Sequence, residues 1–161
     1  MLTDFFSNRV LFVPLIAWAI AQVLKLLLNL AIKRKFDIRL LWAGGGMPSS
    51  HSSTVGALAS VLGWTLGFDS VFFAIAFIFA AVVMHDAMNV RLETGKQSTS
   101  IKQIATLLNH LLTEKDEEIR TEKLKELVGH TPLQVFMGFL IGILTTVVYC
   151  ASVGLAYCSL R

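Results

Sequence analysis

Charged residues are scarce in this chain of 161 residues: they make up 16% of it, whereas 55% of its residues are hydrophobic. The mean hydropathy is +0.67, and a soluble domain of this length could hardly bury so much apolar surface. Long uncharged apolar runs recur along the sequence, and runs of 18 or more such residues are typical of transmembrane helices. The composition therefore excludes a soluble globular protein and predicts a single integral membrane domain over residues 1–161.

Cysteine is rarer still: the two cysteines, Cys150 and Cys158, both lie in the last apolar stretch. Neither belongs to a CxxC pattern or lies near a histidine, so we interpret both as small hydrophobic residues rather than metal ligands or a disulfide. Carboxylates are few around the polar motifs, essentially Asp86 and Glu93, whereas a site built on two metal ions needs more of them. The sequence predicts a site without a metal or another cofactor.

Four hydrophobic segments predict an all-α polytopic membrane bundle of about four transmembrane helices. They cover residues 10–32, 52–68, 70–90 and 133–157, and a polar stretch, 91–131, precedes the last of them. Its section TEKDEEIRTEKLKELVGH mixes both charge signs at helical spacing, which predicts an amphipathic cytoplasmic helix. Seven basic and seven acidic residues cancel over the polar stretch, which argues against nucleic-acid binding.

Two GxxxG spacings, Gly63 to Gly67 and Gly138 to Gly142, predict that helices approach each other closely. We expect these glycines to serve helix packing within the chain. The same pattern also permits a homodimer.

Lysine and arginine are distributed very unevenly between the two sides of the bundle. One side carries eleven of them, in the loop after the first segment and in the polar stretch, and the other side carries Arg9 and Arg161. The positive-inside rule then places both basic loops in the cytoplasm and both termini outside.

With this topology, ionisable residues gather at the cytoplasmic helix ends. Lys25 lies inside the first segment, His51 begins the second, Asp86 and Arg91 follow at the end of the third, and His130 precedes the fourth. Ionisable groups in a membrane are costly, so a functional site with mutual partners is the expected interpretation. The alternatives are a lysine that snorkels to the interface and histidines that merely stand at helix starts.

The stretch GGGMPSSHSST suits an anion at the start of a helix, because its backbone and hydroxyls supply donors from Gly46, Ser49 and Ser50. Lys25 and Arg91 add positive charge, and the arginine fork matches phosphate oxygens. Two histidines can divide a phosphoryl transfer: one attacks phosphorus and the other protonates the leaving oxygen. The same stretch also suits a helix N-cap, with its proline and serines.

Three motifs in this order, GGGMPSSHSSTVGALA, MHDAMNVRLETGKQ and ELVGHTPLQVFMGFLIGI, resemble the divergent PAP2 family. These are small membrane proteins related to acid phosphatases and vanadium haloperoxidases. The similarity extends from AQVLK, at 21–25, through the fourth segment. The resemblance implies an all-helical membrane fold and a metal-independent, phosphatase-like site.

The resemblance also implies roles for individual residues. In PSSH, it gives His51 the role of the acid and makes Ser49 and Ser50 phosphate donors. By chain order, His130 takes the place of the nucleophile, and Lys25 and Arg91 take those of phosphate-binding residues. The chain departs from the family pattern where an aspartate would follow the nucleophile by four residues, because it has Gln134 there. Asp86 is then a candidate to orient a histidine from another helix.

These observations favour a phosphatase that hydrolyses a phosphorylated lipid, a lipid phosphate or pyrophosphate, at the cytoplasmic face of the bacterial plasma membrane. The alternative from another class is a non-catalytic binder or translocator of phosphorylated lipid. A purely structural membrane protein is the third interpretation.

Overall fold

The computed structural model describes residues 8–34, 46–111 and 129–154. Within these ranges the chain forms helices and no strand, which confirms the predicted all-α membrane bundle. The helices are α2 (Arg9–Lys33), α3 (Ser50–Leu66), α4 (Val71–Met88), α5 (Val90–Leu111) and α6 (Pro132–Val153).

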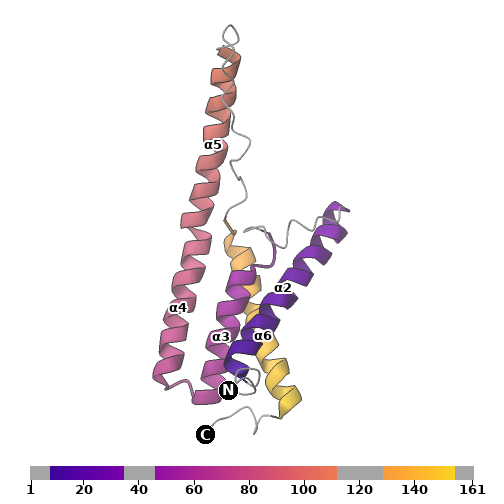
Figure 1. The fold of residues 1–161 in the computed structure, drawn as a ribbon, viewed down its shortest axis with the longest axis vertical. Helices are drawn as coiled ribbons and strands as arrows, with labels where there is room; N and C mark the ends of the chain where they lie inside the picture. Colours follow the sequence, from indigo (N-terminus) through magenta and orange to yellow (C-terminus); the bar gives the residue numbers. More distant parts are fainter. Residues whose placement is uncertain (1–7, 35–45, 112–128, 155–161) are drawn as a thin grey trace.

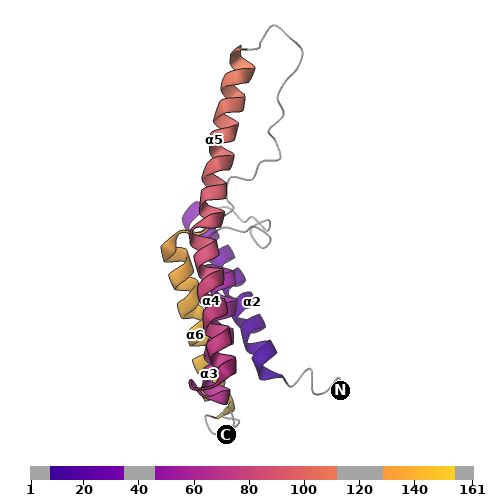
Figure 2. The ribbon, with the colours of Figure 1, turned by 90° about the vertical axis from the view of Figure 1, so that its left-hand side faces the viewer.

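Helices α2, α3, α4 and α6 form the bundle, and α3 lies at its centre in contact with the other three (Figure 1). The first residues of α2 and the last residues of α6 lie at one end of the bundle. The start of α3, the end of α4 and the start of α6 lie at the other end, as the side view also shows (Figure 2). The predicted meeting of these helix termini at one end is therefore found in the fold.

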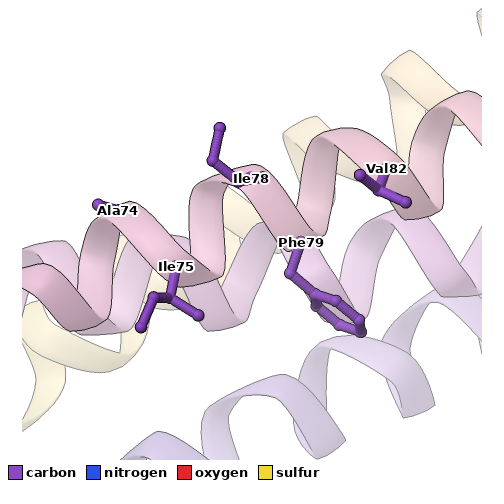
Figure 3. Close-up of a pocket in the computed structure, with 5 residues that line it drawn as sticks. All are labelled: Ala74, Ile75, Ile78, Phe79 and Val82. Atoms are coloured by element: carbon purple, nitrogen blue, oxygen red, sulfur yellow. The ribbon is translucent and has the colours of Figure 1, made fainter.

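Three stretches are long and apolar enough to cross a membrane: Arg9–Ile32, Val71–Leu108, which runs through α4 into α5, and Pro132–Val153. The predicted segment 52–68 forms α3, which is shorter at 17 residues and lies among the others. The outer face of α4 carries an open apolar groove lined by Ala74, Ile75, Ile78, Phe79 and Val82 (Figure 3). Exposed apolar side chains of this kind are suited to contact with lipid.

Helix α5 is a departure from the prediction, which ended the third segment near residue 90 and gave the following residues no helix. Instead α5 continues the direction of α4 beyond the bundle (Figure 1). Its first turns are stabilised locally, since Lys96 and Glu93 form an ion pair of 2.6 Å at i,i+3 spacing. Most of the predicted amphipathic cytoplasmic helix, TEKDEEIRTEKLKELVGH, lies outside the described residues.

Small and hydroxyl-bearing residues hold α3 against its neighbours. Ser53 Oγ donates to the Ala17 carbonyl of α2 at 3.0 Å, and Thr146 Oγ of α6 donates to the Ala57 carbonyl at 3.3 Å. Both hydroxyls are buried. Without water, such hydrogen bonds and close backbone contacts are what associate membrane helices.

The GxxxG pattern of α6 brings that helix against α3. A Cβ atom at Gly138 would overlap the Ser49 carbonyl oxygen, and one at Gly142 would lie 2.7 Å from the Ala57 nitrogen. The expected packing within the chain is confirmed for these two glycines. In the other pair, Gly63 also lies at a close contact, since a Cβ there would be 3.1 Å from Phe73 Cδ2 of α4. Gly67 does not, because α3 ends at Leu66 and Gly67 takes a φ of 95° as its C-cap.

Replacing Gly138 with alanine should destabilise the protein, because the added methyl must displace the α3 backbone. We expect a loss of about 1–3 kcal/mol, the usual cost of overpacking a core, measured by unfolding in detergent. Leu140→Ala, on an exposed position of the same helix, is the control and should cost less. A Gly138→Ala protein as stable as the wild type would show that this contact is not tight.

Cys150 is fully buried in α6, as expected for a small hydrophobic residue, but it is disulfide-bonded. The prediction of two free cysteines is therefore wrong. Cys158 lies outside the described residues.

Candidate active site

Two backbone hydrogen bonds assemble the site at the end of the bundle where α3 and α6 begin. The Ser49 amide donates to the Gln134 carbonyl at 3.0 Å, and the His130 amide donates to the Ala87 carbonyl at 3.1 Å. The first bond joins the segment before α3 to the first turn of α6. The second joins the segment before α6 to the last turn of α4, so three helix termini meet here.

Two of these termini are helix N-termini, whose free N–H groups and dipoles favour an anion. Ser49 is the N-cap of α3: its Oγ accepts from the Ser52 amide at 3.4 Å and from Ser52 Oγ at 3.0 Å. The predicted cap is confirmed. A hydroxyl has two lone pairs and one proton, so the Ser49 O–H remains able to donate to an anion.

Lys25 is brought to this end by α2 and is buried, with 3% of its surface exposed. The backbone of Gly46, at a φ of 105°, lies against its stem, since a Cβ there would be 3.2 Å from Lys25 Cδ. Among the described residues, Lys25 Nζ has no hydrogen-bond partner. The side chain therefore does not snorkel. A buried ammonium group is costly without an anionic or polar partner.

His130 lies immediately before the N-cap of α6 and is fully buried. Its Nδ1 lies 3.2 Å from Gln134 Oε1, and its Nε2 has no hydrogen-bond partner in the described part of the chain. Burial lowers the pKa of His130, and the charges of Lys25 and His51 lower it further. The bond to Gln134 and the backbone of Gly46 oppose this effect without reversing it.

His51, in the first turn of α3, is the exposed partner of this buried histidine. The two ring centroids are 6.2 Å apart, in an edge-to-face arrangement. The helix ends thus bring together both predicted catalytic histidines, of which His130 is buried and His51 is exposed.

The remaining predicted residues are less closely defined. Ser50 is buried in the first turn of α3, and its carbonyl accepts the Thr54 hydroxyl at 2.8 Å. Asp86 is half-buried in the last turn of α4, next to the residue that binds the His130 amide. Its catalytic role stays a prediction. Arg91 belongs to α5, but its side chain lies outside the described part of the structure.

Gln134 is the site residue whose role the sequence interpretation missed. It occupies the position where the family pattern has an aspartate, and its Oε1 contacts both the His130 ring and the Thr131 amide. The signal was present, because Thr131 and Gln134 have the T-x-x-Q spacing of a helix capping box. In the described residues, no group of three or more His, Cys, Asp or Glu side chains could hold a metal ion.

Fold and site together define an integral membrane protein with buried ionisable side chains at one end of its helical bundle. The model of the divergent PAP2 family matches residues 6–145, a range that includes every site residue described above. An uncharacterized membrane protein of Bacillus subtilis strain 168, YuiD, is 41% identical over 151 residues, which are 90% of this chain and 96% of the relative. No solved structure matches the chain. The chain belongs to the divergent PAP2 family.

Proposed function

We propose that the protein is a phosphatase that releases phosphate from a lipid phosphate or pyrophosphate through His130. The observation that carries this proposal is the pair of buried nitrogens, Lys25 Nζ and His130 Nε2, which have no hydrogen-bond partner among the described residues. The two groups are near enough for the lysine charge to lower the pKa of the histidine. A phosphate group offers oxygens to the first nitrogen and an electrophilic phosphorus to the second.

The chemistry then follows from the two histidines. The lone pair of His130 Nε2 forms a bond to phosphorus while the bond from phosphorus to the lipid oxygen breaks, and His51 gives its proton to that oxygen. Water next attacks phosphorus, His51 takes up a proton from this water, and the N–P bond breaks to release phosphate. Lys25 and the Ser49 hydroxyl stabilise the charge on the phosphoryl oxygens.

A phosphorylated lipid is the favoured substrate because His130 and Gln134 lie where the membrane-length helix Pro132–Val153 begins. A lipid headgroup lies at this depth while its acyl chains remain in the bilayer. Arg34 is the C-cap of α2, and Lys96 and Lys102 belong to α5, whereas Arg9 begins α2 at the other end. By the positive-inside rule, we place the site at the cytoplasmic face of a bacterial plasma membrane.

The proposal is tested by phosphate release from a panel of lipid phosphates and pyrophosphates in detergent micelles, with and without a chelator. We expect turnover of at least one substrate, and we expect it to survive chelation. Binding of these lipids without any release would overturn the phosphatase and support the non-catalytic binder or translocator. If the lipids are neither bound nor hydrolysed, the purely structural interpretation is the one supported.

The pH dependence follows from His130, whose pKa lies below its ordinary value of about 6.5. The nucleophile is therefore neutral at pH 7, and the acid limb of kcat/KM should appear only below about pH 6.5. The free energy of unfolding should change in the same direction. Because the histidine binds a proton more readily in the unfolded chain than in the folded one, the folded state should lose stability as the pH falls below about 6.5. A pH–rate profile checks this, and an acid limb well above pH 7 would contradict it.

A further inference from the structure

The side chain of Gln134 forms a small network at the start of α6. Its Oε1 lies 3.2 Å from His130 Nδ1 and accepts a hydrogen bond from the Thr131 amide, also at 3.2 Å. The His130 amide is held in turn by the Ala87 carbonyl at 3.1 Å. Both the backbone and the ring of this histidine are therefore fixed.

The network determines which nitrogen of His130 carries the proton. A backbone N–H can only donate, so the Gln134 atom that faces Thr131 must be the carbonyl oxygen and not the amide nitrogen. That same oxygen faces His130 Nδ1. An oxygen that only accepts requires Nδ1 to be the donor, so a neutral ring has its proton on Nδ1 and its lone pair on Nε2.

We propose that Gln134 is a positioning residue that holds neutral His130 as the Nδ1–H tautomer, with the Nε2 lone pair directed to the substrate phosphorus. The catalytic part of this inference rests on the proposed phosphatase function, whereas the assignment of the tautomer does not. Nε2 is the ring nitrogen that has no partner among the described residues, as a nucleophile awaiting its phosphorus requires.

An amide differs from a carboxylate at this position because it orients the ring without a negative charge. A carboxylate would stabilise the imidazolium ion and keep the ring protonated to higher pH. Gln134 does not offer this stabilisation, in keeping with the lowered pKa of the buried ring. A neutral ring at pH 7 keeps its lone pair, so the glutamine favours attack over protonation.

The test is nitrogen NMR of the full chain in micelles, with ¹⁵N-labelled histidine rings. The His130 signals are those that His130→Asn removes. In the wild type above the pKa, we expect Nδ1 protonated and Nε2 unprotonated. Gln134→Leu should shift the tautomer population of His130 toward the Nε2–H form. Gln134→Glu should raise the pKa of His130 by about one pH unit or more. Gln103→Leu, an exposed glutamine of α5, is the matched control and should change neither.

Activity adds a second readout. Gln134→Leu should lower kcat by at least about 100-fold, as expected for a misoriented histidine, and change KM by less than about threefold. The inference is overturned if wild-type His130 is the Nε2–H tautomer, or if both Gln134 variants leave its tautomer and pKa unchanged. The wild-type spectrum alone decides the tautomer if a variant does not fold. If His130 has the expected tautomer but the protein releases no phosphate, the proposed function is refuted and the tautomer assignment stands.

Discussion

His130→Asn is expected to abolish phosphate release, lowering kcat by at least about 10³–10⁴-fold, because it removes the proposed nucleophile, His130 Nε2. Asparagine is the appropriate replacement because its amide N–H can still donate to Gln134 Oε1, which His130 Nδ1 contacts at 3.2 Å. The loss should therefore occur without loss of the fold. Phosphate release measured on the purified protein, together with its unfolding temperature, checks both parts.

The matched control for this variant is His85→Ala. His85 is exposed in α4, in the turn that contains Asp86, and no part of the proposed mechanism depends on it. It should retain turnover within a few fold of the wild type. Equal activity in the His130→Asn protein would remove His130 from the mechanism. A loss that merely followed a lower unfolding temperature would make the histidine structural.

Lys25→Met is expected to raise KM for the lipid phosphate about 10- to 150-fold, which corresponds to the roughly 1.5–3 kcal/mol of a hydrogen bond to a charged group. Methionine fills much of the same volume against Gly46, whose backbone lies on the Lys25 stem. The variant should be as stable as the wild type or more stable, because it removes a buried ammonium that has no partner among the described residues.

Lys102→Met, on α5, tests the alternative that any lysine near this end attracts the substrate by its charge. It should change KM by less than about twofold at physiological salt, because Lys102 is only half-buried and its charge is screened. A Lys25→Met protein with an unchanged KM and reduced stability would show that Lys25 serves the fold and not the substrate.

The arrangement of the helices could be predicted because apolar runs indicate which segments cross the bilayer and basic loops indicate on which side each segment ends. Once the helices alternate in direction, His51 and His130 must lie at the same end, and the structure places their rings 6.2 Å apart. The depth of each side chain could not be predicted. Burial of His130 and exposure of His51 depend on how α6 docks on α3, a contact set by Gly138 and the Ser49 backbone.

The parts that the sequence interpretation missed have local causes. Gln134 was noted as a departure from the family pattern, although capping-box chemistry at Thr131 makes it a partner of the histidine. The helical character of α5 was hidden by its polar composition, since an apolar run is the pattern from which membrane helices are predicted. The contact of Gly46 with Lys25 joins distant segments, so no sequence pattern indicates it.

The stretch from Gly46 to His51 serves the fold and the site with the same atoms. Ser49 caps α3 with its side-chain oxygen, and its amide donates to the Gln134 carbonyl. His51 follows two residues later, in the first turn of the helix. The cap and the proposed phosphate site therefore use the same helix N-terminus.

The most direct test of the account is capture of the phosphorylated enzyme. The wild-type protein is mixed with a lipid carrying a ³²P-labelled phosphate, quenched within one turnover, and mapped by mass spectrometry. We expect an acid-labile, base-stable phosphoryl group on His130, and none in the His130→Asn protein. Phosphate release that proceeds with no label on His130 in the wild type would contradict the account.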